Sequence, residues 1–174
     1  DLFHHPPTKI LVSTVGIPNA MVRCARRYPE VNLALSLHSV RQDVRERLIP
    51  LAKKYSLEVL RQALHEVNRL QTSTVMIEYL LLEGINDSED DAQELIHWLV
   101  DLKVHVNLIP YNPIEDAPQL AGTQREKRDV FAGFLKKAGL QTTVRYSLGN
   151  DIAAACGQLV RKENQQIAQH NSAI

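Results

Sequence analysis

TVMIEYLLLEGINDSEDDAQELIHWLVDLKVHVNLIP, residues 74–110, is the stretch that decides the fold. It begins with an apolar run at 74–82 and ends with another at 105–109. Both runs are rich in β-branched and aliphatic residues, which is typical of buried strands. Between them a helical face recurs, and Ser88 with Asp91 three residues later marks where that helix begins. A strand, a helix and a second strand in this order predict parallel pairing through a right-handed crossover.

The same alternation extends in both directions from this unit. Apolar runs at 9–13, 31–37 and 141–146 predict three more strands, and we expect all five to be buried on both faces. Three helical faces separate or follow these runs, formed by Leu57, Leu60, Leu64 and Val67, by Ala92, Leu95, Leu99 and Leu102, and by Val130, Phe134 and Ala138. The less regular intervals 18–28 and 40–55 can also hold helices. The sequence therefore predicts an α/β fold with parallel strands and alternating helices, either an open sheet or a partial (β/α) barrel.

Local signals fix several expected helix ends. Ser56 is expected to cap the helix that follows it, and Thr123 with Glu126 has the spacing of a capping box. Pro50 should break a helix in the interval 40–55. Gly139 should end the last helix, because glycine adopts a left-handed conformation without steric cost.

Composition restricts the class of protein. The chain has 174 residues, no long apolar run and no signal-like start, so we expect no membrane span and no secretory leader. Two cysteines fit a reducing compartment, which leads us to expect a cytoplasmic protein. The 20 basic and 20 acidic residues balance, which argues against a general nucleic-acid binder. The charges are nevertheless separated, since 78–94 is acidic and 125–145 is mainly basic.

The length fits one domain, which we place at residues 1–160, followed by a polar tail at 161–174. Polar residues and turn formers follow the predicted strands. In parallel α/β architectures ligands bind outside the carboxyl ends of strands. Candidate binding segments are therefore Ser13 to Gly16, Ser36 to Ser39, Glu83 to Asp87 and Pro110 to Pro113.

Two residues, Cys156 and His38, are candidates for a chemical role, and a structural role is the alternative for each. Cys156 follows three alanines and precedes Gly157, so it is either a small buried residue or a reactive thiol. His38 comes directly after a predicted strand, where its ring either forms a hydrogen bond within the chain or contacts a ligand. The spacing of cysteine and histidine predicts no metal site, and no phosphate-binding glycine loop is present.

Taken in order, the motifs resemble one family. They are Val12 to Gly16 (VSTVG), Leu35 to His38 (LSLH), Ile77 to Tyr79 continuing to Glu83 to Asp87 (EGIND), Val106 to Pro113 (VNLIPYNP), Thr143 to Arg145, and Gly149 to Leu159, which contains AACGQL. From about Lys9 to Val160 the chain resembles the RlmN/Cfr family of radical S-adenosylmethionine (SAM) RNA methyltransferases. The AACGQL segment combined with NLIPYNP is the most specific part of the likeness.

The resemblance implies roles for individual residues. Cys156 would be the cysteine that the family methylates and then uses to donate the carbon. Ser13, the segment Ser36, Leu37 and His38, and Asn112 would contact SAM. These positions coincide with three of the strand ends that the architecture alone selects. A thiol makes chemical sense here, because C2 of adenine is electrophilic and resists direct polar methyl transfer.

The resemblance also implies cofactors and partners. A member of this family uses SAM and a [4Fe–4S] cluster, methylates C2 of an adenosine in 23S rRNA and also accepts tRNA, and needs a reducing partner such as flavodoxin. The family's Cys-x-x-x-Cys-x-x-Cys cluster motif, its catalytic Glu and its resolving cysteine precede the region that this chain resembles, and Cys24 does not match them by position. Asn150 and Ala153 stand where the family often has Asp.

We therefore interpret the chain as the C-terminal part of a radical SAM barrel domain, lacking an N-terminal part of its own chain and inactive alone. One edge of its sheet should then be open. The C8-methylating branch of the same family and a non-catalytic ligand-binding or RNA-binding module remain alternatives at this stage.

Overall fold

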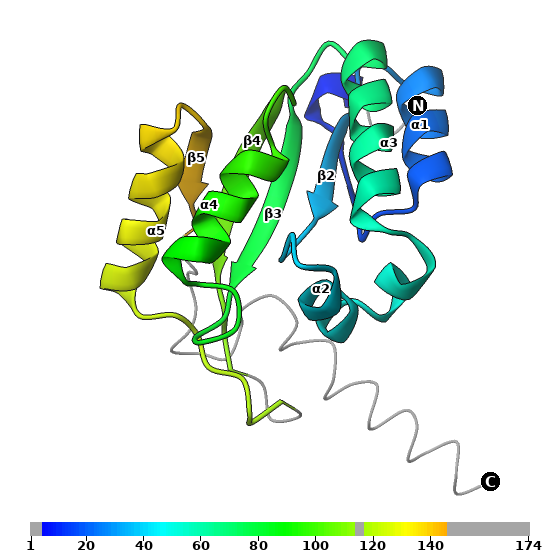
Figure 1. Cartoon of the computed structure of the whole chain (residues 1–174). Coiled ribbons are helices and arrows are strands. Elements are labelled where there is room, and N and C mark those ends of the chain that lie inside the picture. The colour runs from blue at the N-terminus through cyan, green and yellow to red at the C-terminus, as the bar shows by residue number, and fades with distance from the viewer. Residues whose placement is uncertain (1–4, 114–116, 146–174) are drawn as a thin grey trace, which may run out of the picture.

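The computed structural model describes residues 5–113 and 117–145, which form a five-stranded sheet covered by helices (Figure 1). All neighbouring strands are parallel, and the order in the sheet is the order in the chain. The strands are β1 (Leu11–Thr14), β2 (Asn32–Ser36), β3 (Val75–Leu81), β4 (Val104–Pro110) and β5 (Gln141–Val144). The predicted α/β fold with parallel strands is confirmed.

The helices alternate with the strands as expected. Helices α1 (Pro18–Arg27), α3 (Leu57–Leu70), α4 (Glu89–Trp98) and α5 (Arg125–Lys137) lie over one face of the sheet (Figure 1). Helix α2 (Gln42–Leu48) and the 3-10 helix η2 (Pro50–Lys54) lie where the strand arrows of β2 and β3 point. A further 3-10 turn, η1 (Pro7–Lys9), precedes β1. Pro50 does separate two short helices, as its missing N–H predicts.

The expected caps are borne out at two helices and wrong at a third. The hydroxyl oxygen of Ser56 accepts from the backbone N–H of Val59, and Ser88 with Asp91 forms a complete capping box. Thr123 does not cap α5, which begins after Gln124. The Thr123 hydroxyl instead donates to the Asp87 carboxylate at 2.7 Å. A long-range bond to a buried carboxylate has replaced the local cap that the spacing predicted.

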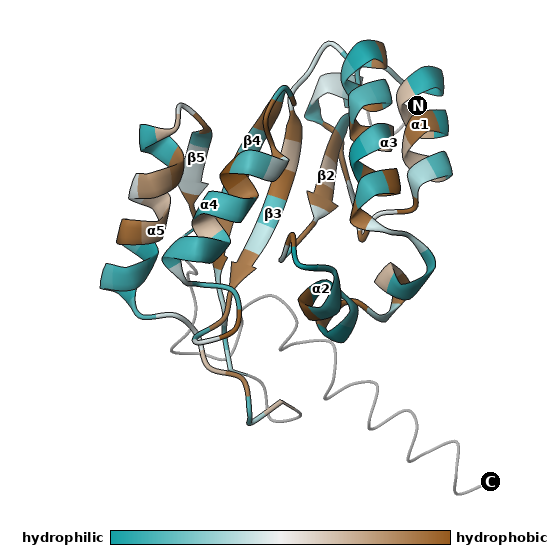
Figure 2. Cartoon of the chain, in the orientation of Figure 1, coloured by the Kyte–Doolittle hydropathy of each residue, from teal (hydrophilic) through white to brown (hydrophobic). Residues whose placement is uncertain are grey.

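The expectation that the strands are buried on both faces holds only in the middle of β2, where Leu33, Ala34 and Leu35 are all buried, and it is wrong for the other four strands. In β3 the buried and half-buried residues alternate, and β4 begins with the same pattern. The buried set packs under the helices and forms the core, whereas the other set faces away from them. Figure 2 shows a hydrophilic segment in the middle of the otherwise hydrophobic β3. Helices cover only one side among the described residues, so the alternation is that of a half-covered sheet.

The buried face of α5 is also displaced from the predicted one. Val130 is 58% exposed, whereas the neighbouring Phe131 is 2% exposed and packs its ring against Tyr79, with ring centroids 5.5 Å apart. Ala132 and Leu135 complete the buried stripe. Gly139 follows the helix with a φ of +85°, as expected for a glycine that ends a helix.

Strand β1 is an open edge, as the sequence leads us to expect. It pairs with β2 and with no other strand of the described part of the chain. Its surroundings expose large apolar side chains, each 38–48% accessible: Ile10, Leu11, Val12, Val15 and Ile17. A group of exposed apolar side chains at an unpaired strand edge is unusual on the solvent-exposed surface of a protein. No helix in the described residues is long and apolar enough to cross a membrane.

Candidate functional site

The carboxyl ends of the parallel strands meet at one edge of the sheet, and three expected binding segments lie there. Ser13 is in β1, one residue before its end, and Ser36 is the last residue of β2. Leu37 and His38 follow directly, and Asn112 comes two residues after β4 ends. The structure therefore places all five expected SAM-contacting positions at or just beyond the same edge.

Ser13 and Ser36 are brought together by a residue that the sequence did not single out. Both hydroxyls donate to the same carboxylate oxygen, Oε2 of Glu78, at 2.8 Å and 3.1 Å. Glu78 lies in the middle of β3 and is paired in register with Ser36, so their side chains project from the same face of the sheet. That face is the one the helices leave uncovered. Three neighbouring strands thus contribute one hydrogen-bonded cluster on the open face, the Ser13–Glu78–Ser36 cluster.

A buried arginine fixes the backbone behind this cluster. Arg45 of α2 is 1% exposed and donates to the carbonyl oxygens of Ser36 at 2.9 Å, of Val15 at 2.6 Å, and of Leu37. Burial lowers the pKa of Arg45 to about 10, so the guanidinium remains charged at neutral pH. The side chain therefore ties the segments that follow β1 and β2 to each other.

Gly16 makes room for that arginine. Its φ is +99°, and a Cβ built there would lie 3.0 Å from an Arg45 nitrogen and 3.1–3.2 Å from two leucine methyl groups. Only glycine combines this backbone conformation with so close an approach. The glycine of the VSTVG motif thus has a packing reason that can be read from the structure.

His38 is held in an uncommon conformation with its ring turned into the fold. Its φ is +61°, and its Nδ1 accepts the backbone N–H of Leu80 at 3.1 Å. Burial, followed by the nearby charge of Arg45, lowers the pKa of His38 to about 4, against the opposing charge of Glu78. The ring is therefore neutral at pH 7. Because Nδ1 is an acceptor, the proton of the neutral ring is on Nε2, and the ring also hydrogen-bonds the backbone of Glu78.

Asn86 holds the His38 segment from the other side. Its side-chain nitrogen donates to the carbonyl oxygens of His38 at 2.6 Å and Leu80 at 2.7 Å, and its side-chain oxygen accepts the Leu82 N–H at 2.8 Å. Asn86 is fully buried, and its carbonyl oxygen accepts the Tyr79 hydroxyl at 3.0 Å. Burial raises the pKa of that hydroxyl well above its usual range, so it stays a donor. The EGIND segment therefore supports His38, the second residue after β2.

Two further expected site residues are Asn112 and Cys156. Asn112 is half-buried just beyond the same edge. Cys156 lies outside the described residues, as do Asn150, Ala153 and the tail at 161–174. Cys24, the cysteine of the described part, is in α1 and partly buried against the core.

Sequence reasoning gave no individual role to Glu78, within the motif Ile77 to Tyr79, or to Asn86, within the candidate segment Glu83 to Asp87, and it did not include Arg45. A carboxylate inside an apolar strand was an available signal for Glu78, because a charged side chain there must face solvent, a partner or a ligand. Arg45 gave no such signal, and Asn86 was included only as part of a strand-end segment. Their roles depend on which backbone carbonyls the fold brings within reach.

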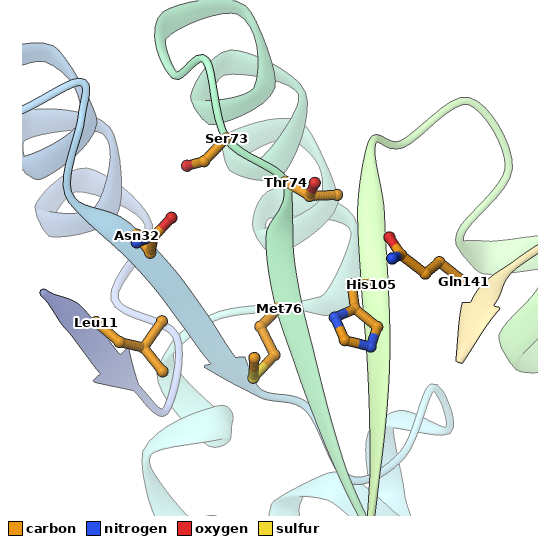
Figure 3. Close-up of a pocket in the computed structure, with 7 residues that line it drawn as sticks. All are labelled: Leu11, Asn32, Ser73, Thr74, Met76, His105 and Gln141. Atoms are coloured by element: carbon orange, nitrogen blue, oxygen red, sulfur yellow. The ribbon is translucent and has the colours of Figure 1, made fainter. Parts of the chain in front are cut away.

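The open face also has a hollow at its other end. A cavity of about 420 Å³ is lined by residues at the amino ends of the strands: Leu11, Asn32, Ser73, Thr74, Met76, His105 and Gln141 (Figure 3). It lies away from the Ser13–Glu78–Ser36 cluster and includes none of the expected binding residues. Among the described residues, no group of three metal-ligating side chains could hold a metal ion. The residues described here thus do not fit an iron–sulfur cluster.

Comparison with known proteins places this arrangement in a class. No family model matches the chain. It is 57% identical over 168 residues to a probable RNA methyltransferase of Rhodopirellula baltica, covering 97% of this chain and 44% of that protein. It is 42% identical over 156 residues to a probable dual-specificity RNA methyltransferase RlmN of Thermus thermophilus, covering 90% of this chain and 44% of that protein.

A solved structure agrees with these relatives. The fold superposes on a radical SAM methyltransferase from Sphaerobacter thermophilus with a TM-score of 0.83 and 41% identity, covering 87% of this chain and 44% of that one. The sheet and its helices are thus similar to part of a radical SAM methyltransferase. The chain belongs to the RlmN/Cfr family of radical SAM RNA methyltransferases. It spans less than half the length of the relatives it matches, which is consistent with the partial barrel that we expected.

Proposed function

We propose that this chain forms the part of a SAM-dependent RNA methyltransferase that contacts SAM through its strand ends and carries the transferred carbon on Cys156. The substrate would be an adenosine of 23S rRNA, methylated at C2, with tRNA as a second substrate. SAM would lie across the carboxyl ends of β1, β2 and β4, at Ser13, the segment 36–38 and Asn112. The observation that carries this proposal is the convergence of Ser13 and Ser36 on Glu78 at that edge.

The residues of this chain would perform two tasks. His38, neutral and held by Leu80 and Asn86, would keep the segment that follows β2 in place beside the ligand. The Cys156 thiolate would attack the methyl carbon of SAM, so that a carbon–sulfur bond forms at the cysteine while the sulfonium bond breaks and S-adenosylhomocysteine leaves. The methyl carbon would afterwards move from that sulfur to the adenine ring.

The second transfer needs one-electron chemistry, which a [4Fe–4S] cluster supplies when it is bound. The described residues offer no ligands for it. We therefore assign the cluster ligands and the contact with a reductant such as flavodoxin to the part of the relatives that this chain does not span.

The test is Cys156→Ala in a protein that joins this chain to the preceding half that its relatives have. The variant should bind SAM like the wild type and transfer no methyl group to an rRNA fragment. Mass spectrometry of the wild-type protein should find a methyl group on Cys156 and none on Cys24. Wild-type transfer by the alanine variant would contradict the role of the thiol.

The position of the methyl group decides between the two branches of the family. Digestion of the product RNA and chromatography against 2-methyladenosine and 8-methyladenosine standards would distinguish them. We expect the 2-methyl product. A product methylated at C8 would assign the chain to the other branch, and no methylated product under conditions where SAM binds would favour a non-catalytic RNA-binding module.

A further inference from the structure

We infer that Glu78 is a positioning residue of the SAM site, which sets the serine hydroxyls of β1 and β2 as hydrogen-bond acceptors toward the ligand. The inference rests on the proposed function, because it concerns the same strand-end site. It adds a role for Glu78, which lies in the motif Ile77 to Tyr79, and a hydrogen-bonding polarity for the site.

The geometry determines which way each hydroxyl proton points. A serine hydroxyl has one proton and two lone pairs, whereas a carboxylate has only acceptor positions. Ser13 donates to Glu78 Oε2 at 2.8 Å and Ser36 donates to the same oxygen at 3.1 Å. Each serine has thus used its only proton. Whatever approaches these hydroxyls from the open face must itself donate a hydrogen bond.

This polarity selects among the groups of a ligand. Hydroxyl and ammonium groups can donate to the serine oxygens, whereas a carboxylate or phosphate oxygen would meet only lone pairs and the negative charge of Glu78. The β1 and β2 side of the edge therefore favours the hydrogen-bond donor groups of a ligand, which restricts how the ligand is oriented.

A purely structural role for Glu78 fits the surroundings less well. Its side chain is on the uncovered face of β3, and it is only half-buried. The hydrophobic core lies on the opposite face, under α3 and α4. Strand pairing between β2 and β3 is made by backbone groups, which do not depend on this side chain. A carboxylate here is therefore not needed to form the sheet.

The test compares three substitutions in the protein joined to the preceding half that its relatives have, with SAM binding measured by calorimetry and methyl transfer by steady-state kinetics. Glu78→Met keeps the length of the side chain and removes the acceptor. Glu78→Gln keeps an oxygen that can accept both hydroxyl protons. Glu58→Gln, at an exposed glutamate of α3, is the matched control.

We expect Glu78→Met to weaken SAM binding by about tenfold or more and to raise the KM for SAM, with kcat and the melting temperature little changed. Glu78→Gln should recover binding to within about threefold of the wild type, and Glu58→Gln should bind normally. In a Ser13→Ala, Ser36→Ala background, Glu78→Met should add little, because its effect passes through those hydroxyls.

The proposed SAM site and the role of Glu78 can be contradicted by different results. A wild-type protein that does not bind SAM would overturn the proposed site and this inference with it. SAM binding by the wild type together with unchanged binding by Glu78→Met would overturn the inference alone. A lowered melting temperature with an unchanged KM would also contradict it, because that is the result of a structural role.

Discussion

Replacing His38 by asparagine should abolish a specific part of the pH dependence of folding. Asparagine tolerates the left-handed backbone at this position, so the change removes the imidazole without forcing a new conformation. The folded chain holds the pKa of His38 at about 4, whereas the unfolded chain returns it to about 6.5. Protonation therefore favours the unfolded state.

The sign and size of the effect follow from these two values. Above pH 6.5 neither state binds the proton and the stabilisation is complete. As the pH falls from 6.5 to 4 the unfolded state takes up a proton that the folded state does not, and stability is lost. The pKa values differ by about 2.5, and each unit is worth about 1.4 kcal/mol, so the total loss is about 3 kcal/mol.

Urea unfolding followed by the fluorescence of Trp98, the single tryptophan, can measure this at pH 7 and pH 4. The wild type should lose about 3 kcal/mol more than His38→Asn over that range. His97→Gln, at an exposed histidine of α4, should lose stability in parallel with the wild type. Parallel losses for the wild type and His38→Asn would show that His38 is not held neutral by the fold.

Three further substitutions test the supports of the site. Arg45→Met should lower the free energy of unfolding by on the order of 3 kcal/mol in urea titrations, because three carbonyl groups, one buried and two partly buried, lose a charged donor; a loss below about 1 kcal/mol would contradict this role of Arg45. Gly16→Ala should lower the free energy of unfolding by about 2 kcal/mol in the same assay, because its Cβ would crowd Arg45 and the backbone has a positive φ. An unchanged free energy of unfolding would mean that this turn relaxes freely. Ser88→Ala should lower stability by about 1 kcal/mol through loss of the α4 cap, with Ser73→Ala, outside any cap, as its comparison.

The parallel direction of the strands could be predicted from the sequence because apolar runs and helical periods alternate without interruption. The same runs led to an expectation of burial on both faces that is wrong for every strand except β2. Continuous apolar runs are typical of strands that are covered on both sides, whereas β3 carries Met76 and Leu80 on the face that no helix covers. The pattern of one strand does not reveal how many layers its sheet has.

Only part of the candidate site could be predicted from the sequence. The gathering of Ser13, Ser36 and His38 at one edge could be predicted, because the carboxyl ends of parallel strands lie at the same edge of a sheet. The role of Arg45 could not, because it depends on three carbonyl groups brought together from two segments of the fold. The Thr123 cap was predicted wrongly for the same reason. The Thr123 hydroxyl donates to Asp87, which lies 36 positions earlier in the chain, and does not cap α5.

The central claim is that SAM binds across the carboxyl ends of these strands. A crystal structure of the protein joined to the preceding half of its relatives, with SAM bound, tests it most directly. We predict that SAM lies within hydrogen-bond distance of Ser13 and Ser36, with donor groups facing the Ser13–Glu78–Ser36 cluster and with Asn112 at the β4 side. SAM seated in the hollow at the amino ends of the strands, or over the helix-covered face, would contradict the account.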